Sequence, residues 1–130
     1  ATSLADFAGA KVTAQLNTFH YSVIDQIPGV DKQAAMDNFP AMRVALQAGT
    51  IDAYVSELPE AISAQAANSD FVMVKLTDGF KASPEDTQTA VGVKKDSPLT
   101  KEINEALKTI SSEERQQIMQ EAIKNQPAAE

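Results

Sequence analysis

The residues that could take part in chemistry gather at two turns, and each turn follows a segment with the pattern of a strand. The first turn is Gln15-Leu16-Asn17-Thr18-Phe19 and the second is Ser56-Glu57-Leu58-Pro59. Thr18 is a residue type that caps helices, and the free N–H groups of the helix turn after it can bind a carboxylate. Glu57 can form a charge-assisted hydrogen bond with an ammonium group. Together the two turns predict a site for a zwitterion such as an amino acid.

Each turn, taken alone, also has a simpler interpretation. Thr18 can cap its helix and do nothing else, and Glu57 can satisfy the positive end of a helix dipole. Ligands of open α/β sheets lie beyond the carboxyl ends of the strands, where loops lead into helices. The binding hypothesis therefore depends on the two turns following neighbouring strands.

The remaining side chains do not indicate an enzyme. His20 is the single histidine and the chain has no cysteine, which excludes thiol nucleophiles, disulfides, and metal sites made of cysteines or several histidines. We interpret His20 as an exposed helix residue, and Glu113-Glu114 and Glu102/Glu105 as helix-surface charges. The 5 glycines are scattered and form no phosphate-binding loop. We expect no catalytic residue, no metal and no cofactor.

Length, composition and net charge exclude several further classes of protein. The 130 residues suit one domain, and the 43% hydrophobic content predicts a folded chain rather than a disordered one. A net charge of -7 argues against a nucleic-acid partner, because such proteins present basic faces to phosphates. The apolar runs are too short to span a membrane. The chain begins Ala1-Thr2-Ser3 without a basic and apolar leader, and we expect it to be a piece of a longer protein.

Strand and helix patterns alternate in the first part of the chain. Strands are predicted at 11–16, 51–56 and 71–76, the last a continuous apolar run that indicates a buried strand; 30–36 could hold another short strand. Helical segments are predicted at 4–8, 19–27, 39–48 and 60–67. This alternation predicts an α/β lobe of three layers with a mixed, mostly parallel sheet.

The pattern changes after residue 76. Residues 77–88 are predicted to form an exposed connector, 89–93 a short strand, and 98–110 and about 112–124 two helices. Both helices are amphipathic and need an apolar surface to cover. Since the sheet already has its own helices, we expect these two either to fold back on the α/β unit or to pair with a second copy, as a homodimer or by domain swapping.

Five segments, in order, resemble type 2 periplasmic substrate-binding proteins. Residues 3–12 (SLADFAGAKV) resemble the dLkGkkV entry to the family's second lobe, and QLNT at 15–18 resembles its Q-x-G-T turn. LQAGTIDAYV at 46–55 and SELPEA at 56–61 resemble L-x-x-G-x-[IV]-D-A and x-D-x-P. TAVGVKKDS at 89–97 resembles yGIAvxKgs, and 99–123 resembles the closing helix pair. The likeness covers nearly the whole chain and points to the amino-acid-binding branch of ABC importers.

The resemblance implies a two-lobe protein that closes on a polar amino acid between its lobes and delivers it to an ABC permease. Residues 1–84 then form the second lobe, and 90–130 return as a strand and helices to the first lobe, most of which this chain lacks. The hinge crossing between them is Glu85, Asp86, Thr87, Gln88 and Thr89.

The resemblance also assigns roles to the two turns. Thr18 and the backbone at Phe19 contact the ligand carboxylate, and Glu57 stands where the family's Asp holds the ammonium. Gln15 and Ser56 lie where selectivity for the ligand side chain is set. Two positions depart from the family pattern.

Asn17, in the same ligand-binding turn, replaces the usual glycine, and asparagine tolerates the positive φ that glycine favours. Glu57 is one methylene longer than the family's Asp.

The same likeness implies a location and leaves an alternative. It predicts an extracytoplasmic protein, either lipid-anchored at the surface of a Gram-positive bacterium or periplasmic. Proteins of this two-lobe fold also serve as effector-binding sensor or regulatory domains. A lipobox cysteine upstream would favour the importer, and a winged helix-turn-helix upstream would favour the regulator.

Overall fold

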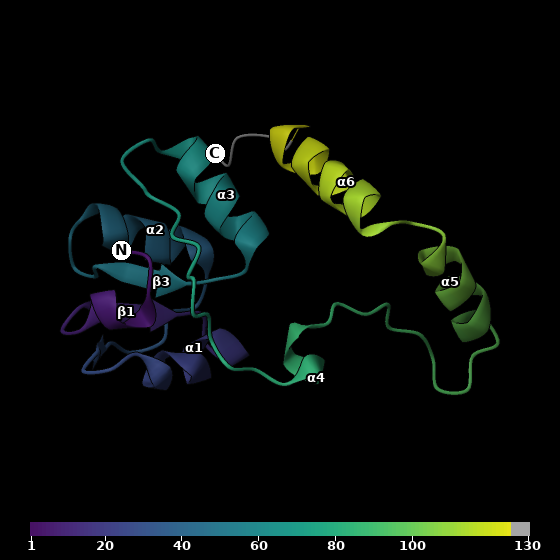
Figure 1. The fold of residues 1–130 in the computed structure, drawn as a ribbon, viewed down its shortest axis with the longest axis horizontal. Helices are drawn as coiled ribbons and strands as arrows, with labels where there is room; N and C mark the ends of the chain where they lie inside the picture. Colours follow the sequence, from purple (N-terminus) through teal and green to yellow (C-terminus); the bar gives the residue numbers. More distant parts are fainter. Residues whose placement is uncertain (126–130) are drawn as a thin grey trace. The chain divides into compact units, whose positions relative to one another are not determined.

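The computed structural model describes residues 1–125, and the chain divides into two compact units. The first unit is Ala1–Thr87 and the second begins at Gln88. Residues 126–130, at the end of the predicted segment 90–130, lie outside the described residues. The two units are described separately below and are drawn in Figure 1.

A small open sheet of three strands forms the centre of the first unit. Its strands are β1 (Lys11–Ala14), β2 (Asp31–Lys32) and β3 (Ala53–Val55). They are all parallel, in the order β2-β1-β3, so β1 is central. The expected α/β class is confirmed. Within the described residues the sheet is wholly parallel, and the expected mixture of strand directions is wrong.

Helices separate the strands along the chain, as expected, with shifted ends. The first unit holds the 3₁₀ turns η1 (Leu4–Phe7) and η2 (Ile24–Gln26), and the helices α1 (Phe19–Val23), α2 (Phe39–Gln47), α3 (Leu58–Ala67) and α4 (Pro84–Thr87). Asn38 caps α2, since its Oδ1 accepts a hydrogen bond of 2.9 Å from the Ala41 amide. The predicted helix 19–27 tightens from α to 3₁₀ geometry at Ile24.

Both faces of the sheet carry helices. Val12 and Ala14 point to one face, where they form the buried core with Ile24 and Ile27. Thr13, one residue out of phase, points to the other face, as the two-residue period of a strand requires. Tyr54 is its partner in register and bonds to Glu60 of α3 on that face. In Figure 1, α1 and α2 lie on opposite sides of β1 and β3.

The buried strand predicted at 71–76 does not form. Val72 is 80% exposed, and the backbone of the segment joins no ladder. Two of its amides are engaged locally instead: the Phe71 amide donates to the Asn68 carbonyl at 3.0 Å, and the Met73 amide donates to Gln65 Oε1 at 2.7 Å. A side-chain acceptor on α3 therefore replaces the carbonyl that a neighbouring strand would offer.

The short strand predicted at 89–93 is also absent. Residues 81–96 are exposed throughout, including Val91 and Val93. A strand needs a partner for its backbone groups, and none of the described residues pairs with this segment. Its β-branched residues alone do not make it a strand.

The connector after residue 76 is exposed for only part of its length. Its first residues return to the start of the chain, where the Leu4 amide donates to Asp78 and the Thr77 amide donates to the Thr2 carbonyl. Phe80 packs on the core. The Gln26 amide group exchanges two hydrogen bonds with the Lys81 backbone, at 2.7 and 2.8 Å. The connector is therefore fixed to the first unit as far as Lys81.

Residues 88–125 of the second unit form two helices, α5 (Leu99–Lys108) and α6 (Ser112–Asn125). Ser111 caps α6, because its Oγ accepts from the Glu114 amide at 3.1 Å and Glu114 Oε2 accepts from the Ser111 amide at 2.8 Å. The hydrogen bonds that Ser111 makes to the Glu114 carboxylate, above all the one from its amide, lower the pKa of Glu114. The described residues of both helices include none that is buried, and Leu99, Leu107, Ile118 and Met119 are all largely exposed.

Ile24 is expected to carry much of the stability of the first unit, since this first residue of η2 is fully buried in the core with Val12 and Ala14 of β1. Ile24→Ala should lower the free energy of unfolding by about 2–5 kcal/mol, because it removes buried apolar contacts and leaves a cavity. Urea unfolding followed by tyrosine fluorescence reports on this unit, because both tyrosines, Tyr21 and Tyr54, lie in it. Val44→Ala, at a side chain 68% exposed on α2, is the control and should change that energy by less than about 1 kcal/mol. Equal effects of the two substitutions would contradict the assignment of the core.

Candidate functional site

The strand order brings the two predicted turns to neighbouring positions. Ala14, the last residue of β1, pairs with Val55, the last residue of β3. Gln15 and Ser56, the next residues, therefore lie side by side at the ends of these two strands, and Gln15 also forms a parallel bridge with Met36. β2 lies beside one edge of β1, and the chain then returns past β1 to place β3 beside the other edge. The direction in which the chain adds strands therefore reverses between β1 and β3. In open α/β sheets this reversal point is where ligands bind.

The first turn is held by its own polar groups. Thr18 Oγ1 donates to the Gln15 carbonyl at 2.7 Å, and Gln15 Nε2 donates to the Asp37 carbonyl at 3.1 Å. Asn17 has a φ of 61°, in the left-handed region that glycine favours. The asparagine thus takes the conformation for which glycine would otherwise be needed.

Thr18 occupies the N-cap position of α1, but its side chain does not cap the helix. Its hydroxyl instead points back to Gln15. The Tyr21 amide bonds to the Thr18 carbonyl at 3.2 Å. The amides of Phe19 and His20 precede this bond, in the part of a helix whose N–H groups have no intrahelical acceptor.

The second turn presents a carboxylate. Glu57 is the N-cap residue of α3, yet its side chain makes no capping hydrogen bond and is 49% exposed. Ser56 Oγ donates to the Glu57 carbonyl at 3.2 Å. Pro59 lies in the first turn of α3, where a missing N–H costs nothing.

An ion pair fixes the first turn of α3 against its neighbours. Arg43 of α2 holds Glu60 through both carboxylate oxygens, at 2.8 and 2.9 Å, and Tyr54 donates to the same carboxylate at 3.3 Å. Burial alone would lower the pKa of Arg43, but Glu60 offsets this, so the pKa is raised. Burial, reinforced by Glu60, raises the pKa of Tyr54. This cluster, which the sequence did not reveal, positions the helix turn that carries Glu57.

His20 is not the exposed helix residue that the sequence suggested. Its side chain is only 17% exposed, and its Nε2 lies 3.8 Å from Glu57 Oε2. The imidazole also packs on the Phe19 ring, with 4.3 Å between centroids. Burial lowers the pKa of His20, and the Glu57 charge partly offsets that lowering. A usable signal was present: His20 comes two residues after Thr18, at the same sheet edge as Glu57.

The predicted hinge residues lie at the boundary between the two units. Glu85, Asp86 and Thr87 belong to the short helix α4, while Gln88 and Thr89 are exposed and outside any helix or strand. Asp86 Oδ2 accepts a hydrogen bond of 2.8 Å from Ser83 Oγ at the start of α4.

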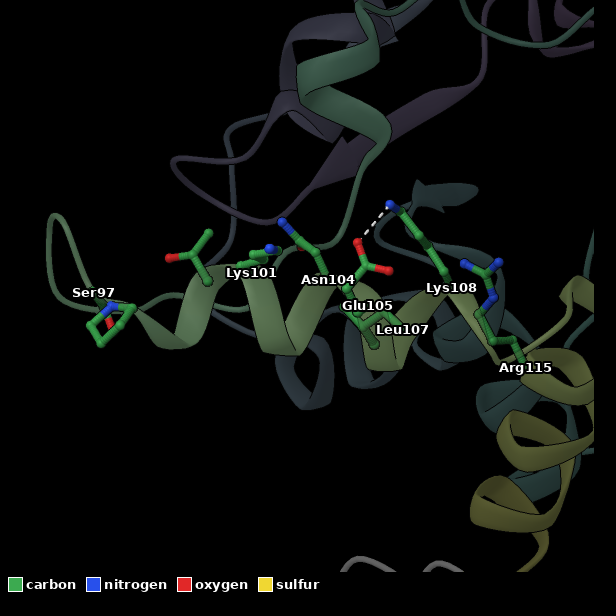
Figure 2. A pocket seen from close by; sticks show the side chains of 9 residues that line it. Ser97, Lys101, Asn104, Glu105, Leu107, Lys108 and Arg115 are labelled. Atoms are coloured by element: carbon green, nitrogen blue, oxygen red, sulfur yellow. Dashed lines mark hydrogen bonds and ion pairs between the residues drawn. The ribbon is translucent and has the colours of Figure 1, made fainter.

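A separate hollow lies on the second unit, and none of the predicted site residues lines it. Figure 2 shows it along α5, with the Glu105–Lys108 ion pair at 3.1 Å and Arg115 of α6 nearby. Its lining residues are Ser97, Pro98, Thr100, Lys101, Asn104, Glu105, Leu107, Lys108 and Arg115. Charges of both signs and an aliphatic residue line it, which favours no one class of ligand.

Residues 1–125 contain neither a cluster of metal ligands nor a membrane-spanning helix. Groups of three or more acidic or histidine side chains able to hold a metal ion do not occur among them. None of their helices is long and apolar enough to cross a bilayer.

Comparisons with known protein families, with curated proteins and with solved structures give no match for this chain.

The backbone at Asn17 gives a direct test of the first turn. Asn17→Val should destabilise the first unit by about 1–3 kcal/mol, because a β-branched residue is strained at positive φ. Asn17→Gly should stay within about 0.5 kcal/mol of the parent, since glycine adopts this conformation freely. The check is urea unfolding of both variants, and equal stability of the two would refute the left-handed turn.

The pKa of His20 predicts a dependence of stability on pH. Because this pKa is lowered from 6.5 on folding, the unfolded chain binds the proton more tightly than the folded chain. The contribution of the neutral His20 imidazole to the free energy of unfolding is therefore complete above about pH 6.5 and is lost as the pH falls through the lowered pKa. His20→Gln should remove this component, so the difference in unfolding free energy between variant and parent should change across the window. Parallel pH profiles for the two proteins would contradict the prediction.

Proposed function

We propose that the chain supplies one lobe, and the returning segment of the other, in a two-lobe protein that binds a polar amino acid and presents it to an ABC permease. The observation that carries this proposal is the strand order β2-β1-β3, which puts the two polar turns at the reversal point of the sheet. The sequence resemblance supplies the transport role, and the geometry is compatible with it.

In this proposal the first turn binds the ligand carboxylate. The amide of Phe19 faces a carboxylate that sits beyond the end of β1, and the left-handed backbone at Asn17 sets the direction of the turn. The Thr18 hydroxyl joins this contact by turning from the Gln15 carbonyl, to which it donates in this structure. Gln15 and Ser56, which leave neighbouring strands, border the ligand side chain.

The second turn binds the ligand ammonium through Glu57. The carboxylate is half exposed and makes no capping bond, so it is accessible to a cation. The Arg43–Glu60 pair holds α3 in place, which limits the loss of freedom when the ligand binds. The extra methylene relative to aspartate moves the ammonium further from the sheet.

The whole protein then acts by closure and not by chemistry. Residues 85–89 form one hinge crossing, and the exposed apolar faces of α5 and α6 pack on the rest of the longer protein. In isolation these faces pair with a second copy of the chain. We place the protein outside the cytoplasm, lipid-anchored at a Gram-positive cell surface.

Because one lobe contacts only half of the ligand, this chain alone should not bind amino acids in the micromolar range. A thermal-shift panel of the protein amino acids should leave its melting temperature unchanged, while the longer protein with both lobes should be stabilised by its own ligand. Micromolar binding by this chain would overturn the two-lobe proposal. The absence of any shift for the two-lobe protein would overturn amino-acid binding itself.

A further inference from the structure

His20 and Glu57 come from different helices and meet at the reversal point of the sheet. His20 lies in the first turn of α1, and Glu57 is the residue before α3. The 3.8 Å between Nε2 and Oε2 is short enough for an ion pair when the imidazole is protonated. The pair therefore spans the two turns that the proposed ligand would bridge.

The charged residues on the elements that pack against α1 are engaged or distant, so Glu57 is the charged partner of His20. On β1 the charged residue is Lys11, at the far end of the strand. On η2 it is Asp25, which pairs with Lys32 at 2.9 Å, and Lys32 lies over the Tyr21 ring. Among the described residues, Glu57 is the charged group that acts on the imidazole.

We propose that His20 is a further residue of the candidate site and competes with the ligand ammonium for Glu57 when it is protonated. This inference rests on the proposed function. A neutral imidazole leaves the carboxylate to the ligand, whereas an imidazolium 3.8 Å away neutralises it. The site thus favours an amine ligand at neutral pH and releases it on acidification.

The exposure of the two side chains suits this role. Glu57 is 49% exposed, so both the ligand and the imidazole can reach its carboxylate. His20 is 17% exposed and packs on Phe19, so its ring is held toward Glu57 and not free in solvent. Burial lowers the pKa of His20 and so keeps the imidazole neutral at neutral pH, where the ligand would bind.

The first experiment needs no ligand. Because His20 is the single histidine, its Hε1 proton gives one identifiable NMR signal whose titration reports the pKa directly. Glu57→Gln should lower the pKa of His20 further, since it removes the charge that favours the imidazolium. Asp70→Asn, which removes an exposed carboxylate outside the ion pairs described, should leave that pKa in place. An unchanged pKa in Glu57→Gln would overturn the inference.

The second experiment adds L-serine as a polar zwitterion, at concentrations high enough to detect weak binding by chemical shifts. Below the pKa of His20, simple competition weakens binding by about tenfold per pH unit, and above it the affinity is constant. N-acetyl-L-serine, which lacks the ammonium, should show no such loss. His20→Gln should abolish the dependence between about pH 5 and pH 8, where glutamine cannot titrate.

The outcomes separate this inference from the proposed function. Serine binding that is independent of pH in the parent protein would overturn the competition and leave the amino-acid site intact. No serine binding at about pH 8, even at the highest serine concentration, would overturn this inference but leave the two-lobe proposal standing, because that proposal already expects one lobe to hold its ligand weakly. Binding that weakens on acidification in the parent but not in His20→Gln would support both.

Discussion

The parallel pairing of β1 with a strand on each side is the constraint on which the first unit depends. β1 supplies Val12 and Ala14 to the core on one face and Thr13 to the other, and both turns of the candidate site are placed relative to its end. Thr13 is fully buried, and its hydroxyl donates to the Ala34 carbonyl at 2.8 Å, which fixes the segment after β2 against the centre of the sheet. A polar group in that position is stable only because the bond is made.

The alternation of strands and helices could be predicted from sequence as far as residue 67, because it depends on local signals. Asn38 and Pro59 mark helix starts, and glycines with positive φ, such as Gly49, mark ends. The segments 71–76 and 89–93 are as rich in residues typical of strands as the segments that form β1 and β3, yet they form no strand. Composition does not specify a partner, and strand formation depends on one.

The candidate site shows the same limit. The positions of Gln15, Thr18 and Glu57 at strand ends followed from the chain order, because parallel strands end at one edge of a sheet. The contact of His20 with Glu57 and the pairing of Arg43 with Glu60 join residues 37 and 17 positions apart. Chain order brings His20 and Glu57 to one sheet edge, but no local pattern indicates that the side chains of either pair touch. These contacts depend on how α1, α2 and α3 pack, which spacing alone does not determine.

The segment FVMVKL at 71–76 has a consequence for the solubility of the chain. It is apolar and β-branched, and a segment of this kind outside a sheet can associate with its copies on other chains. Two features oppose that association. Lys75 is exposed and adds a charge that stacked copies would repel, and Gln65 occupies the Met73 amide that an added strand would need. One side chain on α3 thus protects a backbone position that the sheet leaves unpaired.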